Sequence, residues 1–220
     1  MLNTSDVPPG DTTRAKAIPI IIVLSTLLLA FVWLAFRVGL FGKPHPLPIL
    51  GSLPAFSLTA SNGRPFTQGD LQGRVWIANF IYTTCPSVCP MLSGQMLKVE
   101  RALERAGRTD VRLVSFSVDP KNDTPETLTS YGQRFSADPQ RWFFVTGEHA
   151  ALHHLIIDGF HLAVAERSAE QNTDGEGLIT HSDRFVLLDK DMQVRGYYRG
   201  SENDEVQQLL HDAVTLQPER

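Results

Sequence analysis

The chain contains two cysteines, Cys85 and Cys89, in the sequence YTTCPSVCP. They follow residues 75–82 (VWIANFIY), an apolar run of the length expected for a central strand, and precede a predicted helix. Backbone N–H groups at the start of a helix favour negative charge, so the pKa of a thiol falls there. Because the thiolate binds soft metals and attacks disulfides, the pair predicts metal binding or thiol–disulfide exchange.

The spacing of the cysteines favours a metal site without excluding redox chemistry. Redox thioredoxins carry two residues between their cysteines, whereas this chain carries three. If both were helical, their Cβ atoms would lie about 5–6 Å apart, wider than the 3.5–4.5 Å or so that a disulfide needs. A structural disulfide between them would stabilise the fold by only roughly 2 kcal/mol, through the constraint that it places on the unfolded chain. Structural zinc needs four ligands, and the chain has no second cysteine pair.

His181 is the candidate third ligand. It lies in LITHSDRFVLLD, after the polar segment 166–178 and before an apolar strand, where a side chain can project over a neighbouring loop. Two thiolates and one imidazole form a soft three-coordinate set that suits Cu(I) and also admits Cu(II). His149 and His153 are spaced i, i+4 and could share a metal, but no cysteine is near, and a solvated helix face is the simpler interpretation.

Alternating strand and helix patterns predict an α/β domain with a mixed central sheet flanked by helices. Asn62-Gly63 predicts a hairpin turn between its first two short strands. The expected strands are 56–58, 65–66, 75–82, 111–118, 142–145, 160–164, 184–188 and 194–198. The expected helices run from the cysteines to about Gly107 and over 124–135, 148–157 and 202–216.

Residues 18–36 (IPIIIVLSTLLLAFVWLAF) are nineteen residues without a charge. A helix of this length spans roughly 28 Å, close to the thickness of the hydrocarbon core of a bilayer. Two alternatives to a membrane anchor fit less well. A cleaved signal peptide would have a shorter apolar region followed by a small-x-small cleavage site. A helix that is apolar on every face at an N-terminus is rarely a buried core helix. We therefore expect a retained transmembrane anchor, whose balanced basic flanks leave its orientation open.

The net charge is −4 with no long run of Lys or Arg, so the sequence provides no electrostatic basis for binding nucleic acid. Prolines and glycines between positions 42 and 54 predict an extended spacer rather than a packed element. The expected organisation is an N-terminal tail (1–17), the anchor (18–36), a Pro/Gly-rich spacer (37–53), a folded domain (54–216) and a C-terminal tail (217–220).

Taken together, these segments resemble the Sco/SenC family of copper-delivery proteins. The matching pieces are the N-terminal anchor, YTTCPSVCP, FSVDPKNDTPETLTSYGQRF, and THSDRFVLLD with its histidine 92 positions after Cys89. The similarity covers about residues 54–216, and the combination of the cysteine motif, the Asp-Pro stretch and a distant histidine is specific.

The resemblance implies a thioredoxin-like fold, with Cys85, Cys89 and His181 as copper ligands and the two cysteines as a redox pair. It also implies a role in assembling the dinuclear copper centre of cytochrome c oxidase subunit II, and hence an upstream copper donor. The N-terminal tail does not resemble a mitochondrial presequence. We therefore expect a single-pass protein of a bacterial inner membrane, with its domain in the periplasm.

Two other functions are open at this point. One is a membrane-tethered thiol–disulfide oxidoreductase, and the other a peroxide-reducing enzyme, for which the sequence offers no trusted peroxide site. A metallochaperone is a binding protein rather than an enzyme.

Ser87 and Thr180 depart from the family pattern, in which many members have Asp at the first position and some at the second. Asp119 and Asp123 are expected to be structural, shaping the loop after the second central strand.

Overall fold

The structure is a computed structural model that describes residues 25–34, 46–162, 165–166, 179–180 and 183–216. It divides into two units, residues 1–46 and 47–220. In the first unit, residues 25–34 form a helix with exposed side chains. Among the described residues, no helix is both long and apolar enough to cross a bilayer. Both ends of the predicted anchor, 18–24 and 35–36, lie outside the described residues, so the anchor stays a prediction.

The second unit is built on a mixed sheet, as expected, with strand order β1-β10-β9-β4-β5-β6-β2-β3. β4 and β6 pair in parallel with β5, while the other pairings in the sheet are antiparallel. The described strands of this sheet are β1 (Gly51–Ser52), β2 (Ser57–Ala60), β3 (Pro65–Thr67), β4 (Trp76–Ile81), β5 (Arg112–Ser117), β6 (Trp142–Thr146), β9 (Arg184–Leu188) and β10 (Gln193–Arg199). A separate pair is formed by β7 (Ala165–Glu166) and β8 (Ile179–Thr180).

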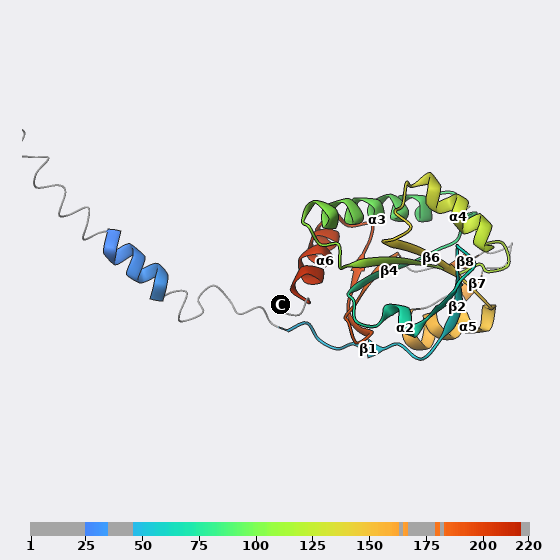
Figure 1. Ribbon diagram of the computed structural model, residues 1–220, viewed down its shortest axis with the longest axis horizontal. Helices are drawn as coiled ribbons and strands as arrows, with labels where there is room; N and C mark the ends of the chain where they lie inside the picture. The colour runs from blue at the N-terminus through green and yellow to red at the C-terminus, as the bar shows by residue number, and fades with distance from the viewer. Residues whose placement is uncertain (1–24, 35–45, 163–164, 167–178, 181–182, 217–220) are drawn as a thin grey trace, which may run out of the picture. The chain divides into compact units, whose positions relative to one another are not determined.

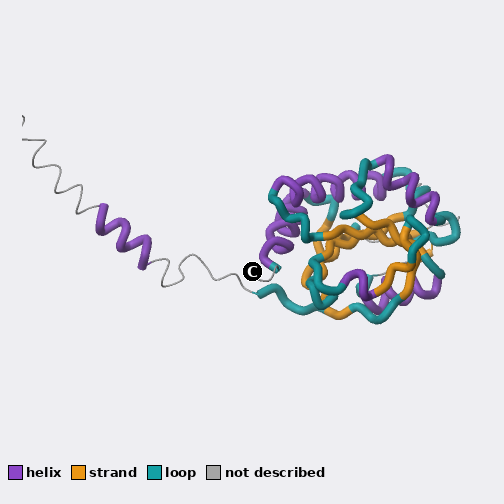
Figure 2. Tube along the Cα trace, viewed as in Figure 1, coloured by secondary structure: helices purple, strands orange, loops and turns teal. Residues whose placement is uncertain are grey.

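Helices cover both faces of the sheet. In Figure 1, α3 and α4 lie on one face and α2 and α5 on the other, and the strands form a curled layer between them in Figure 2. α6 packs against β10 and α3. The described helices of this unit are α2 (Gln68–Leu71), α3 (Val88–Arg105), α4 (Pro125–Arg134), α5 (His149–His154), its π-helical continuation η1 (Leu155–Gly159) and α6 (Asn203–Thr215).

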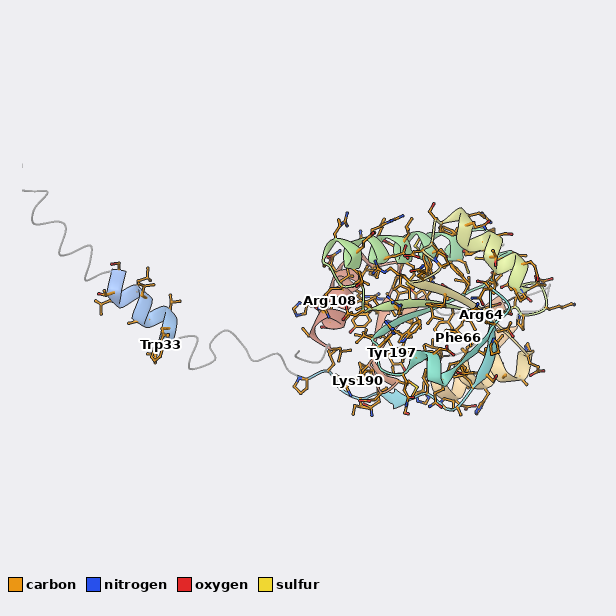
Figure 3. All side chains as sticks on the ribbon, in the orientation of Figure 1. Trp33, Arg64, Phe66, Arg108, Lys190 and Tyr197 are labelled. Atoms are coloured by element: carbon orange, nitrogen blue, oxygen red, sulfur yellow. The ribbon has the colours of Figure 1, made fainter. Side chains whose placement is uncertain are left out.

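The core sits where the apolar strands cross the middle of the domain. Every residue of β4 is buried, as are all residues of β5 except Arg112, which agrees with the mostly apolar sequences of two central strands covered on both faces. Aromatic side chains fill the space beside them. The ring of Phe66, labelled in Figure 3, has its centre 6.0 Å from that of Trp76 and 5.9 Å from that of Phe143.

The structure differs from the sequence-based expectation at the spacer. β1 pairs with β10, and Leu53 is only 3% exposed, so the end of the predicted spacer packs on the domain. Arg195 of β10 holds the preceding residues in place, because its guanidinium donates to the carbonyl oxygens of Leu47 and Pro48. The proline and glycine content predicted an unpacked spacer. Its end packs because of strand pairing and hydrogen bonds from one arginine, which local composition does not reveal.

The prediction of a strand at 160–164 is wrong for residues 160–162, the part of this range that the structure describes, because they have no strand structure. Phe160 instead ends η1, where its N–H donates to the carbonyl of Leu155 at 2.9 Å. Its ring is fully buried and lies with its centre 5.0 Å from that of Phe80 and 5.4 Å from that of Phe116. The apolar pattern therefore came from a core-filling ring after a helix rather than from a strand.

Candidate metal centre

The cysteine motif lies at the edge of the sheet where β4 ends and α3 begins. Residues 82–87 form the connecting loop, and Cys85 is in this loop, one turn before α3, while Cys89 is the second residue of α3. Cys89 belongs to the buried face of α3, as its spacing with Leu92 and Met96 predicts. Cys85 is not helical, so the distance expected for two helical residues does not apply to the pair.

The two cysteines contact each other directly. The backbone N–H of Cys89 donates to the Sγ atom of Cys85, with 3.3 Å between N and S. The N–H of Cys85 in turn donates to the carbonyl of Tyr82 at 3.2 Å, which closes the loop. Both cysteines are thiols and both are buried, Cys85 with 6% of its surface exposed and Cys89 with none. The loop therefore points the Cys85 sulfur at the first N–H groups of α3.

The surroundings of Cys85 favour its thiolate. Burial acts to raise its pKa, but hydrogen bonds from the N–H groups of Cys89 and Ser87, together with one from the side chain of Tyr82, outweigh burial and bring the pKa below its ordinary value. This is the effect that the sequence position predicts, since N–H groups at a helix start stabilise an anion.

The surroundings of Cys89 have the opposite effect. Burial raises the pKa of Cys89 well above its usual range, and the charges of Cys85 and Asp123 raise it further. The pair therefore combines a sulfur that ionises readily with one that keeps its proton until a metal or another sulfur takes its place. Such a pair can hold a soft metal or perform disulfide exchange.

Asp123 connects the cysteine loop to the neighbouring strand. Its carboxylate accepts from the hydroxyl of Thr83 at 2.6 Å and from the backbone N–H of Thr83 at 3.1 Å, and it also accepts from the hydroxyl of Ser117 at the end of β5, at 2.6 Å. Burial raises the pKa of Asp123, although these hydrogen bonds act to lower it. The structural role expected for Asp123 is confirmed, and it extends to the loop that carries Cys85.

Tyr131 of α4 contacts α3 one turn after Cys89. Its hydroxyl is hydrogen-bonded to the hydroxyl of Ser93 on α3, with 2.9 Å between the oxygens. Burial raises the pKa of Tyr131, and the charges of Cys89 and Cys85 raise it further. Sequence reasoning missed Tyr82, Thr83 and Tyr131. The position of Thr83 near the loop that follows β5 could have been predicted, because neighbouring parallel strands end at the same edge of a sheet.

The third predicted ligand, His181, lies outside the described residues. The described chain on either side of it is Thr180, at the end of β8, and Asp183, which precedes β9. Among the described residues, no group of three or more His, Cys, Asp or Glu side chains could hold a metal. Ser87, one of the two departures from the family pattern, is exposed and is the N-cap residue of α3, where its side chain makes no capping hydrogen bond.

Comparison with known proteins decides the family. A family model described as SCO1/SenC matches residues 51–215. The chain belongs to the SCO1/SenC family. A SCO1 protein homolog of Bacillus subtilis (strain 168) is 29% identical over 166 residues, which are 75% of this chain and 82% of the relative. The resemblance inferred from the motifs is therefore confirmed.

Solved structures of Sco proteins share the fold. A SCO1/SenC family lipoprotein of Bacillus anthracis (strain Ames) is 31% identical with a TM-score of 0.69, covering 77% of this chain and 96% of that protein. BsSco is 28% identical with a TM-score of 0.65, and the match covers 79% of this chain and 100% of that protein. BsSco is a member of the Sco family of cytochrome c oxidase assembly proteins in which a disulfide switch has been identified. ScoI of Bradyrhizobium japonicum, solved with copper bound, is 26% identical with a TM-score of 0.62, covering 76% of this chain and 99% of that protein.

Proposed function

We propose that this Sco protein is a copper metallochaperone that holds copper through Cys85, Cys89 and His181. Its target is the dinuclear copper centre of cytochrome c oxidase subunit II, to which it delivers copper or whose cysteines it prepares. One observation carries the proposal: two buried cysteines, one with a lowered and one with a raised thiol pKa, are in contact at the start of α3, in a family with a member solved with copper bound.

The donor set suits copper as cargo. Thiolates select Cu(I), and an imidazole allows Cu(II) to bind as well. Cys85 supplies the first thiolate because its pKa is lowered, and Cys89 loses its proton as the metal enters, so loading releases a proton. The neighbouring residues Thr84, Pro86 and Ser87 are exposed, and we infer that a partner approaches the buried Cys85 sulfur from this part of the loop.

The register of β9 supports His181 as the third ligand. β9 runs antiparallel to β4, and Ala78 pairs with Val186. The N-terminal end of β9 therefore lies toward the C-terminal end of β4, where the cysteine loop begins. His181 is two residues before Asp183, a separation of at most about 7 Å along the chain, so we infer that its imidazole can reach this loop.

We also propose that residues 18–36 anchor the chain in the inner membrane and that the domain lies in the periplasm. The support is the charge-free apolar stretch and the target itself, a copper centre assembled outside the cytoplasm. Membrane fractionation, followed by protease treatment of spheroplasts, tests this arrangement. Cleavage of the domain only after outer-membrane removal is expected, whereas protection of the domain in intact spheroplasts contradicts it.

A second candidate function is thiol–disulfide exchange, favoured by the opposite pKa shifts of the two cysteines. The Cys85 thiolate would attack a disulfide of the target and form a mixed disulfide. Cys89 would then give up its proton and attack the Cys85 sulfur, which releases the target as a dithiol and leaves a Cys85–Cys89 disulfide. This step needs no metal and no histidine.

A competition titration of the full-length protein with Cu(I) and a chelating dye tests the copper proposal. We expect one tightly bound copper per chain, and an affinity at least a hundredfold lower in Cys85→Ser and in Cys89→Ser. Ser87→Ala is the matched control within the same loop and should bind as the wild type does. Wild-type affinity in both cysteine variants would contradict the proposal and leave disulfide exchange as the candidate.

A further inference from the structure

Two histidines face each other on α5. His149 and His153 are one turn apart and exposed, and their ring centres lie 5.9 Å apart with 25° between the ring planes. We propose that this pair is a second metal site, which binds a divalent transition metal and prefers Cu(II). The proposal does not depend on the cysteine site.

The ring separation fits one shared metal. A metal lies about 2.0–2.1 Å from a bound imidazole nitrogen, hence about 3.2 Å from the ring centre, so two rings on one metal have centres no more than about 6.4 Å apart. The observed 5.9 Å is within this reach. Because both side chains are exposed, small rotations can bring the rings to the closer spacing of a tetrahedral or square-planar site.

The backbone holds the pair at this spacing. The side chain of Glu148 caps the start of α5 by accepting from the N–H of Ala151 at 3.2 Å. Leu152, between the two histidines, is buried, and so is Leu155 at the beginning of η1. α5 also packs against β2. The helix is therefore fixed by its opposite face, and a bound metal would need to order only two side chains.

The chemistry of the site follows from its donors. Two imidazoles without a thiolate suit Cu(II), Ni(II) and Zn(II), and the general order of affinities places Cu(II) first. No third His, Cys, Asp or Glu completes a metal-binding group among the described residues, so water would fill the other positions. The site is expected to be open, exchangeable and weaker than a thiolate site.

The pair is separate from the cysteine motif. Figure 1 shows α5 on the face of the sheet opposite to α3, whose N-terminal turn carries Cys89. His154 is the next residue along α5, and its Nδ1 atom is 2.7 Å from a carboxylate oxygen of its own partner, Asp158. His154 therefore offers a matched control, because it is exposed on the same helix and its ring contacts Asp158.

The test is a Cu(II) titration of full-length protein in which Cys85→Ser, Cys89→Ser and His181→Gln remove the proposed first site. Wild-type protein with both thiols alkylated provides a second background if the triple variant does not fold. Calorimetry gives the affinity, and electron paramagnetic resonance detects imidazole nitrogens bound to copper. His149→Gln, His153→Gln and His154→Gln are then compared in the same background.

We expect one Cu(II) with imidazole nitrogen signals. Its affinity should fall at least tenfold in His149→Gln and in His153→Gln, and change less than twofold in His154→Gln. Zn(II) should bind the same background more weakly than Cu(II). The proposal is overturned if neither background binds Cu(II), if both glutamine variants bind as their background does, or if His154→Gln weakens binding as much as they do.

Discussion

The carboxylate of Asp123 accepts hydrogen bonds from both the backbone N–H and the hydroxyl of Thr83, two residues before Cys85. Forty residues separate Thr83 from Asp123 in the sequence. A third hydrogen bond, from Ser117, joins the same carboxylate to the end of β5. The position of the cysteine loop therefore depends on a buried carboxylate that is itself not proposed as a ligand.

Asp123→Asn is expected to destabilise the fold while retaining copper binding. The amide keeps one acceptor oxygen but places an NH₂ group against donors, so at least one buried hydrogen bond is lost, at a cost of about 1–3 kcal/mol. Urea unfolding measures this cost. Asp119→Asn is the control, because Asp119 accepts from the side chain of Asn122 at an exposed position. Loss of copper from folded Asp123→Asn would contradict the expectation that this carboxylate contributes to stability and not to binding.

Cys85 is expected to react with iodoacetamide at least tenfold faster than Cys89 in reduced protein at pH 7. The pKa of Cys85 is lowered, whereas burial raises that of Cys89, and only the thiolate is a nucleophile. Peptide mapping by mass spectrometry gives both rates. As the pH rises, the rate at Cys85 should also reach its plateau at a lower pH than the ordinary thiol pKa of about 8.5 would give. In urea the two rates should converge, and equal rates in the folded protein would contradict the assignment.

Glu100→Gln is expected to stabilise the protein at neutral pH. Glu100 is 2% exposed, and burial raises its pKa although the backbone N–H of Asp138 donates to it at 3.2 Å. A carboxyl with a raised folded pKa contributes stability below its unfolded pKa of about 4.3, and this contribution is lost as the pH rises through the folded value. The wild type should therefore lose stability relative to the variant as the pH rises.

Urea midpoints of both proteins between pH 4 and pH 7 measure this difference. Glu104→Gln, an exposed position on the same helix, should differ little from the wild type across the range. A Glu100→Gln protein that is less stable than the wild type at pH 7 would show that the charged form is favoured by the fold.

Arg195→Ala is expected to release the segment before β1. The guanidinium donates to the carboxylate of Asp189 at 2.6 Å and to the carbonyl oxygens of Leu47 and Pro48. With the Asp189 side chain only 6% exposed, removal of its partner should cost about 1–3 kcal/mol. Hydrogen exchange in residues 47–53 should become faster, while Arg101→Ala, at an exposed ion pair, should change neither quantity. Unchanged exchange in Arg195→Ala would contradict this role.

Local patterns predicted the elements that carry the site. The apolar run at 75–82 became β4, and the strand expected at 111–118 and the helix expected at 124–135 became β5 and α4. The stripe that includes Cys89 and Leu92 also gave the buried face of α3 correctly. These features depend on residues close in sequence, where period and capping chemistry suffice.

Features that depend on distant residues could not be predicted in this way. No local pattern encodes the hydrogen bond between Thr83 and Asp123 or the hydrogen bonds by which Arg195 holds the end of the spacer on the domain. The same is true of the π-helical turn η1. The contribution of His181 belongs to the same class, because it requires a residue from late in the chain to reach the cysteine loop. It is therefore the claim that most needs a direct measurement.

That measurement is a comparison of His181→Ala with the wild type in two assays of the full-length protein, Cu(I) affinity by chelator competition and the rate of disulfide exchange with a model dithiol. Loss of the imidazole should lower Cu(I) affinity by orders of magnitude, because two sulfurs remain but the third donor is gone. Exchange should be largely intact, because it needs only Cys85 and Cys89. An unchanged Cu(I) affinity would contradict the three-ligand site and leave a redox pair.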